Sequence, residues 1–240
     1  MADPRTEVIA RRFSGVRRII AVSSGKGGVG KSMVSAALAL GLRDRCPRVG
    51  LLDLDFTSPS THLILGAEGL TPTEDRGIVP PEARGLSYMS IVHFSRDNPA
   101  PLRGADVSNA IIELLAITRW GDLDYLVIDM PPGLGDATLD MIRLVPRIEF
   151  LVVSTPSRLA YESVRKLLTL LREQRVPTLG VVENMTTEPS EYVRNETESA
   201  GFTYLGPLNL DADVEDSIGD PDKLRKTCFY AQVKRVSEKL

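Results

Sequence analysis

The sequence has 240 residues, of which 42% are hydrophobic and 25% are charged, and its formal net charge at pH 7 is −3. A chain of this length and composition can bury a core of ordinary size within one domain. The slightly acidic balance gives no reason to expect a nucleic-acid partner. The two cysteines, Cys46 and Cys228, match neither a disulfide framework nor the paired spacing of a metal site.

The N-terminal residues 1–17 are basic but lack the apolar stretch of a secretory signal peptide. We expect them to form an N-terminal extension to a single domain over residues 18–240. No apolar run approaches the roughly 20 residues that a membrane span needs. The sequence therefore predicts a cytoplasmic protein, and a membrane is not an expected partner.

Short apolar segments alternate with helical patterns along the chain. The predicted strands cover residues 18–23, 48–53, 86–92, 125–129, 148–154, 178–183 and 202–205. The predicted helices cover residues 31–45, 105–118, 158–174 and 224–240, and a loop covers residues 70–85. Ser157 is the expected N-cap of the third helix. Apolar strands between helices predict an α/β fold: a doubly wound, mostly parallel sheet of about seven strands with helices on both faces.

The first predicted strand leads into a complete phosphate-loop motif, G-x-x-x-x-G-K-[ST]. The motif consists of Gly25, Lys26, Gly27, Gly28, Val29, Gly30, Lys31 and Ser32. Its glycines let backbone N–H groups turn toward phosphate oxygens, and the start of the next helix favours anions. We expect Lys31 to contact the β- and γ-phosphates of ATP, and Ser32 to bind Mg²⁺. The alternative is a glycine-rich turn that happens to precede a helix.

Lys26 is a lysine that an ordinary phosphate loop does not need. Because its side chain starts from the outside of the loop, it can reach across a dimer interface to the nucleotide of a second subunit, as an arginine finger does in trans. Lys26 and Lys31 are therefore both candidate catalytic residues. The alternative for Lys26 is a solvated surface lysine.

Carboxylates follow the second and fourth predicted strands. Asp53 and Asp55 are spaced by one residue, so they point to the same face of an extended chain and can hold Mg²⁺ through its hydration shell. We expect Asp55 to position the attacking water as a third catalytic residue, and Asp53 to belong to the metal site. Asp129 ends an apolar strand in the Walker B pattern and is predicted to bind Mg²⁺ or its water ligands. A capped loop is the alternative for Asp53 and Asp55.

A segment rich in proline and glycine follows Asp129 and is predicted to be a switch. Its candidate residues are Pro132, Gly133, Gly135 and Asp136. The prolines stiffen the exit from the strand, and the glycines allow unusual backbone angles. Such a loop can contact the γ-phosphate through a glycine N–H and move on hydrolysis. The alternative is a tight turn.

Two further segments offer contacts to the adenine base. Asn184 ends the sixth predicted strand, and its amide can both donate to and accept from the edge of adenine. Pro207 and Leu208 follow the last predicted strand and are expected to close over the base. An ordinary turn is the alternative for Asn184.

The same motifs resemble a known family. The loop with Lys26 is similar to the deviant Walker A motif of the dimeric ATPases that include nitrogenase iron protein and the septum-site ATPases. Within that group, residues 123–136 and 180–185 resemble the Mrp/ApbC family of iron–sulfur cluster carriers, as do residues 89–91 and the pair Arg103-Gly104. The resemblance covers residues 18–210 in the family's order.

The resemblance implies a homodimer with ATP or ADP at its interface. It also implies that Lys26 acts across that interface, that Asp53, Asp55 and Asp129 surround Mg²⁺ and water, and that Asn184 contacts adenine. The family carries a C-x-x-C pair soon after Asn184, whereas residues 186–201 here contain no cysteine. Carboxylates and hydroxyls, which occur there instead, are poor ligands for cluster iron.

Three functions remain open from the sequence. The favoured one is a Mg²⁺-dependent ATP-hydrolysing switch, slow on its own, that assists iron–sulfur cluster or metallocofactor assembly through a client apoprotein or assembly partner. It would act as a homodimer or as a mixed dimer with a cysteine-bearing relative. The second is a membrane- or partner-positioning ATPase of the septum-site or partitioning type that would bind a membrane in its ATP state. It is suggested by the basic, loosely amphipathic C-terminal helix, which can otherwise pack on the core. The third is a module that binds ATP without hydrolysing it.

Overall fold

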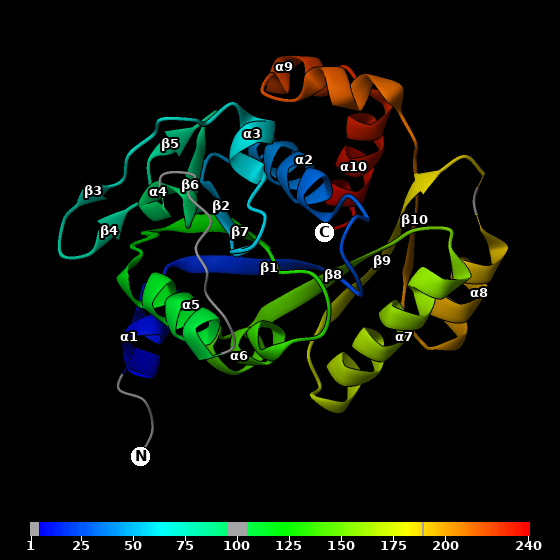
Figure 1. The fold of residues 1–240 in the computed structure, drawn as a ribbon, viewed down its shortest axis with the longest axis horizontal. Helices are drawn as coiled ribbons and strands as arrows, with labels where there is room; N and C mark the ends of the chain where they lie inside the picture. The colour runs from blue at the N-terminus through cyan, green and yellow to red at the C-terminus, as the bar shows by residue number, and fades with distance from the viewer. Residues whose placement is uncertain (1–4, 96–104, 189) are drawn as a thin grey trace.

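The computed structural model describes residues 5–95, 105–188 and 190–240 of the chain, so the pair Arg103-Gly104 lies outside the described residues. Within these ranges, eight strands form one sheet in the order β10-β9-β8-β1-β7-β2-β6-β5 (Figure 1). Its strands are β1 (Val16–Ser24), β2 (Val49–Asp53), β5 (Glu82–Ala83), β6 (Leu86–Ser90), β7 (Leu123–Asp129), β8 (Ile148–Ser154), β9 (Thr178–Thr186) and β10 (Tyr204–Asn209). A separate two-stranded hairpin consists of β3 (Thr73–Glu74) and β4 (Ile78–Val79).

The strands of the sheet are parallel from β10 through β6, and only the short β5 pairs antiparallel with its neighbour. Parallel strands require a crossover on one face of the sheet for each step. Side chains on β1 show that both faces are covered: Ile19 and Ala21 belong to one apolar cluster, whereas Ile20 and Val22 belong to the other. The predicted doubly wound fold is therefore confirmed.

The helices form one layer on each face of the sheet (Figure 1). One layer contains α1 (Arg5–Arg12), α5 (Ala105–Ile117), α6 (Asp136–Leu144), α7 (Arg158–Glu173) and α8 (Glu191–Ser199). The other layer contains α2 (Lys31–Arg43), α3 (Thr61–Leu65), α9 (Pro221–Leu224) and α10 (Cys228–Glu238). The remaining short elements are α4 (Val92–Ser95) and the 3₁₀ helix η1 (Ala212–Ser217). Ser157 caps α7 by accepting a hydrogen bond from the N–H of Ala160, as predicted.

The residues before the first predicted strand contribute to the core. Ile9 of α1 and Phe13 are fully buried, and α1 packs against α5. Strand β1 also begins at Val16, two residues before the predicted start. The division of the chain into an extension and one domain stays a prediction.

The C-terminal segment differs from the single helix predicted over residues 224–240. It forms α9 and α10, and Thr227 between them caps α10 by accepting a hydrogen bond from the N–H of Tyr230. The apolar side of α10, including Phe229, Val233 and Val236, is buried against α2 and β10. Packing on the core therefore accounts for its amphipathic pattern. Across the described parts of the chain, none of the helices combines the length and apolar character that a membrane crossing demands.

Candidate active site

The phosphate loop joins β1 to α2 in a conformation that requires glycine. Gly30, the residue that precedes α2, has a φ of 77°, in the left-handed region. A Cβ atom on Gly30 would lie 2.3 Å from Nδ2 of Asn184, and one on Gly25 would lie 2.5 Å from the backbone of Ser163 in α7. Any other residue at either position would collide with a neighbouring element, so these glycines let the loop curl tightly at the carboxyl edge of the sheet.

A cavity of about 370 Å³ opens in front of this loop. Lys26, Gly27, Gly28, Gly30, Lys31 and Ser32 line one side of it. Asp55 and Pro132 line it from the loops that follow β2 and β7, and Leu63, Ile64 and Ile218 supply an apolar wall. The cavity therefore brings together three of the predicted motifs at the carboxyl ends of parallel strands, where ligands of α/β sheets bind.

Asp129 at the end of β7 lies behind the cavity wall and contacts two residues that line it, Lys31 and Ser32. Its side chain is completely buried, and Oδ1 accepts hydrogen bonds from Nζ of Lys31 at 2.6 Å and Oγ of Ser35 at 2.7 Å. Oδ2 accepts a hydrogen bond from Oγ of Ser32 at 2.6 Å. Because burial of a lone carboxylate is costly, the ion pair with Lys31 and the two hydroxyl groups make its charge tolerable.

The residues present fit a magnesium ion. Hydroxyl and carboxylate oxygens are the hard ligands that Mg²⁺ prefers, and it usually keeps phosphate and water oxygens in its remaining positions. Ser32 and Asp129 would hold the ion, and when bound it would neutralise charge on the phosphate oxygens. Among the residues described, His, Cys, Asp and Glu side chains do not gather in groups of three or more that could hold a metal ion.

Asp53 differs from Asp55 in its surroundings. Asp53 is completely buried beside Asp129, its partner in the register of β2 and β7, and it does not line the cavity. Burial, and then the charge of Asp129, raise the pKa of Asp53 to about 7, against the opposing effect of its hydrogen bonds from Thr61 and the Asp55 N–H. Asp55 is 7% exposed and lines the cavity. The geometry thus brings Asp55, but not Asp53, to the cavity wall.

The predicted switch segment is tied to the strand that carries the phosphate loop. The N–H of Met130 donates to the carbonyl of Val22, and the N–H of Gly133 donates to the carbonyl of Ser24 at 3.0 Å. Gly133 has a φ of 85°. Gly135 has an extended backbone and immediately precedes α6, whose first residue is Asp136. A shift of this segment would therefore act on the start of a helix.

Asn184 lies behind the phosphate loop. Its Nδ2 donates to the carbonyl of Val29 at 2.9 Å, and the side chain is 4% exposed. It therefore braces the loop in this structure, while its contact with adenine stays a prediction.

Pro207 and Leu208 were expected to follow the last strand, but they lie within β10, where they pair with Glu183 and Asn184. Leu208 is 1% exposed, so its side chain packs in the core.

Lys26 is exposed at the cavity, and its side-chain ammonium has no hydrogen-bond or ion-pair partner among the residues that the structure describes, whereas its backbone carbonyl accepts a hydrogen bond from Oγ of Ser24. The structure also adds residues that the motifs did not reveal. Ser35 lies one helical turn after Lys31, which is a spacing from which its contact with Asp129 could have been anticipated. Thr61, which donates to Asp53, belongs to a short helix that had no sequence signal.

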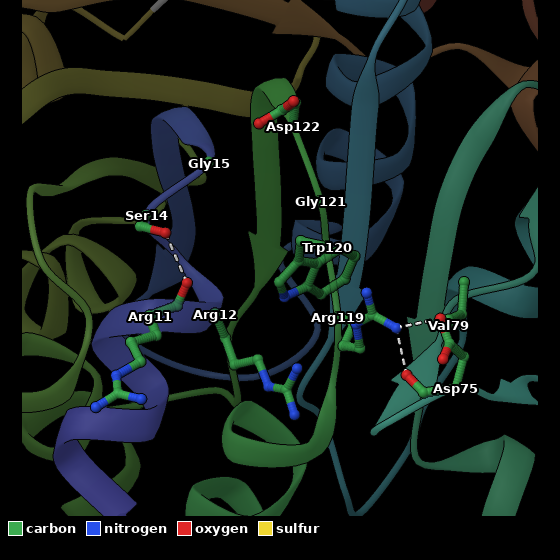
Figure 2. A pocket seen from close by; sticks show the side chains of 10 residues that line it. All are labelled: Arg11, Arg12, Ser14, Gly15, Asp75, Val79, Arg119, Trp120, Gly121 and Asp122. Atoms are coloured by element: carbon green, nitrogen blue, oxygen red, sulfur yellow. Dashed lines mark hydrogen bonds and ion pairs between the residues drawn. The ribbon is translucent and has the colours of Figure 1, made fainter.

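A larger cavity, of about 510 Å³, lies at the opposite edge of the sheet (Figure 2). Arg11, Arg12, Arg119 and Trp120 are among its lining residues, but the arginines already have partners. Arg12 donates to the carbonyl groups of Ala116 and Arg76, and Arg119 pairs with Asp75. Arg11 forms an ion pair with Glu7. These contacts tie α1, α5 and the β3–β4 hairpin together, so the cavity size alone does not indicate a ligand site.

Comparison with known proteins identifies the family. The sequence profile of the ParA family, described as NUBPL iron-transfer P-loop NTPases, matches residues 15–220. The iron–sulfur cluster carrier protein of Pseudomonas fragi is 47% identical over 177 residues, which cover 72% of this chain and 62% of that protein. The iron–sulfur cluster carrier protein of Aquifex aeolicus is 36% identical over 252 residues, which cover 95% of this chain and 69% of that protein.

The chain belongs to this family of iron-transfer P-loop NTPases. The resemblance predicted from the motifs is thus confirmed. Among solved structures, a nucleotide-binding protein from Archaeoglobus fulgidus in complex with ADP is 31% identical, with a TM-score of 0.77, and the match covers 92% of this chain and 93% of that one. As a member of this family, the chain has the fold of an ATP-binding P-loop ATPase. It spans less than two thirds of the length of the Pseudomonas fragi relative.

Proposed function

We propose that this protein is a Mg²⁺-dependent ATPase of the cytoplasm that works as a nucleotide-driven dimeric switch in iron–sulfur cluster or metallocofactor assembly. The observation that carries the proposal is the contact of buried Asp129 with Lys31 and Ser32, two residues of the phosphate loop that line the cavity. These residues place a cation, a hydroxyl and a carboxylate where a triphosphate and Mg²⁺ would meet. Family membership supports the assembly role.

The proposed reaction is in-line attack of water on the γ-phosphate. The water oxygen bonds to the γ-phosphorus as the bond to the bridging oxygen breaks, which gives ADP and inorganic phosphate. Asp55 would orient the water by accepting a hydrogen bond from it. Lys31 would neutralise charge on the β- and γ-phosphates. The segment from Pro132 to Asp136 would follow the γ-phosphate, because Gly133 is already joined to the phosphate-loop strand.

The proposal includes a dimer with nucleotides at its interface. Exposed apolar side chains follow the carboxyl ends of several parallel strands: Leu134 after β7, Leu159 after β8 and Leu210 after β10 are 41%, 83% and 64% exposed. Met185 near the end of β9 is also 41% exposed and lies beside Gly30. A group of exposed apolar residues around a site favours an interface there. The side chain of Lys26, which has no partner among the described residues, would then reach the nucleotide of the second subunit.

The assembly role would be exercised on a client apoprotein or through an assembly partner. The sequence between β9 and α8, residues 187–190, contains no cysteine, and the two cysteines lie elsewhere: Cys46 after α2 and Cys228 at the start of α10. A partner that supplies thiolates would therefore complete the site for iron. This partner is either a client or a cysteine-bearing relative in a mixed dimer. Capture of interacting proteins with an ATP-trapped Asp55→Asn variant would distinguish them.

Single-turnover hydrolysis of radiolabelled ATP by the full chain tests the proposal. Wild-type protein should release phosphate slowly but measurably when Mg²⁺ is present. Asp55→Asn should reduce the rate at least about a hundredfold while ATP still binds, because only the orientation of water is lost. Asp122→Asn, an exposed aspartate at the opposite edge of the sheet, is the matched control and should hydrolyse as wild type does. Absence of hydrolysis in the wild-type protein would reject an ATPase and favour a module that only binds ATP.

A further inference from the structure

A chain of buried hydroxyl groups runs from β6 to the carboxylate of Asp53. The hydroxyl of Thr61, at the start of α3, donates to Oδ2 of Asp53 at 2.6 Å. The hydroxyl of Tyr88 on β6 lies 3.0 Å from the same Thr61 oxygen. All three side chains are completely buried. Most buried polar groups in proteins are hydrogen-bonded, and here each of the three side chains has a partner within the chain of hydroxyl groups.

The hydrogen bonds in this chain have one direction. A threonine hydroxyl has a single proton, and when Asp53 is ionised and can only accept, that proton is given to Asp53. Tyr88 must therefore donate to Thr61. Burial, and then the nearby charge of Asp53, raise the pKa of Tyr88, so the phenol keeps the proton that it donates. Two hydroxyl groups thus donate in series: Tyr88 donates to Thr61, and Thr61 donates to the carboxylate of Asp53.

The carboxylate of Asp53 is also hydrogen-bonded to the turn that contains Asp55. Its Oδ1 accepts a hydrogen bond from the backbone N–H of Asp55 at 3.0 Å, and its Oδ2 also accepts one from the backbone N–H of Thr61 at 3.2 Å. Oδ1 of Asp55 in turn accepts from the backbone N–H groups of Thr57 and Ser58. A buried carboxylate therefore joins the two ends of the segment from Asp53 to Thr61, and Asp55 lies inside that segment facing the cavity.

We propose that Thr61, held by Tyr88, is a positioning residue for ATP hydrolysis: it fixes Asp53, which fixes the turn that presents Asp55 to the cavity. This inference rests on the proposed function, in which Asp55 orients the attacking water. Thr61 itself is completely buried and does not line the cavity, so it acts through other residues. Its contribution is to hold Asp55 in the geometry that hydrolysis needs, because small displacements of a catalytic group lower the rate strongly.

A matched pair of substitutions tests this role. Thr61→Val keeps the shape of the side chain but removes the hydroxyl, whereas Thr61→Ser keeps the hydroxyl and removes a methyl group. We expect Thr61→Val to lower the single-turnover rate of ATP hydrolysis about tenfold and to leave ATP affinity within about twofold of wild type, since the phosphate loop is untouched. Thr61→Ser should restore the rate to within about threefold of wild type.

Three results would overturn the inference. They are an unchanged rate in Thr61→Val, equal losses in Thr61→Val and Thr61→Ser, and a loss of ATP affinity as large as the loss of rate. If thermal melting shows that Thr61→Val does not fold, the rate of ATP hydrolysis by Tyr88→Phe tests the proposal instead. That variant should lose about threefold in rate with unchanged ATP affinity, and an unchanged rate would contradict the proposal. Failure of the wild-type protein to hydrolyse ATP would instead reject the proposed function, which the Asp55→Asn comparison tests separately.

Discussion

The two edges of the sheet both carry cavities lined by charged side chains, but the charges are used differently. At the amino edge, Arg12 and Arg119 are bonded to backbone carbonyls and to Asp75, and the cavity of about 510 Å³ is the space that remains between the tied elements (Figure 2). At the carboxyl edge, the smaller cavity of about 370 Å³ is lined by Lys26, whose side-chain ammonium has no partner among the described residues. Availability of charge, rather than volume, therefore distinguishes a candidate ligand site from a structural gap.

The difference follows from the direction of the strands. Every parallel strand ends at the carboxyl edge, so the loops that follow β1, β2 and β7 converge there with their polar residues. The amino edge receives the loops that enter the strands, and its arginines serve to hold α1 and the β3–β4 hairpin against α5. Variants at the two edges should therefore separate nucleotide chemistry from stability.

Lys26→Ala should give the largest effect. If this lysine acts across a dimer interface, its loss should slow hydrolysis about a thousandfold, or ~4 kcal/mol, because trans-acting cations at phosphoryl transfer have effects of that size. Nucleotide affinity should change much less. Lys223→Ala, an exposed lysine in α9 that does not line the cavity, is the control. Equal losses of hydrolysis and binding in quench-flow and affinity measurements would mean that Lys26 acts only on its own nucleotide.

Lys31→Met should weaken nucleotide binding about a hundredfold, or ~3 kcal/mol, because a charge-assisted contact to phosphate is lost while the side-chain length is kept. Titration of fluorescent ADP into the variant measures this change. Asp129 loses its ion pair in the same variant but retains the hydroxyl groups of Ser32 and Ser35. Melting curves should accompany the titration, and an affinity equal to that of the wild type would remove Lys31 from the site.

The dependence of the free energy of unfolding on pH should reflect the protonation of Asp53. Because the pKa of Asp53 in the folded protein, about 7, lies above its ordinary value, the folded chain retains a proton that the unfolded chain loses. The free energy of unfolding without nucleotide should therefore fall as the pH rises from about 4 to about 7, by on the order of 2 kcal/mol. Urea unfolding at several pH values measures the slope. Asp53→Asn should flatten it, and an identical slope in that variant would contradict the assignment.

Arg12→Ala should give the smallest effect and should confine it to stability. The variant loses two hydrogen bonds to backbone carbonyls, so the free energy of unfolding should fall by about 1 kcal/mol. Nucleotide affinity and hydrolysis should match the wild type. A change in either of them would show that the amino-edge cavity takes part in the function and would break the comparison between the two edges.

Features encoded by local patterns could be predicted from the sequence. Apolar runs marked the seven long strands, and the complete phosphate-loop motif placed Lys31 and Ser32 correctly at the start of a helix. Strand β5 was missed because two residues carry no periodic signal. The last strand was placed too early because Pro207 suggests a break, whereas β10 lies at the edge of the sheet, where proline is tolerated.

The buried hydrogen bonds around Asp53, behind the cavity, could not be predicted in the same way. Thr61 and Tyr88 are 27 residues apart: the pairing of β2 with β6 brings Tyr88 beside β2, whereas Thr61 contacts Asp53 from the start of α3. The burial that raises the pKa of Asp53 likewise depends on β7 as a neighbour of β2. Such relationships arise from tertiary packing, for which a single sequence offers no local pattern.

Calorimetric titration of the full chain with Mg-ADP is the most direct test of the central claim that the phosphate loop between β1 and α2 binds a nucleotide. The proposed site predicts saturable binding with one nucleotide per chain, which Lys31→Met weakens and Arg12→Ala leaves unchanged. Absence of any binding heat at several temperatures, from wild-type protein shown to be folded, would contradict it.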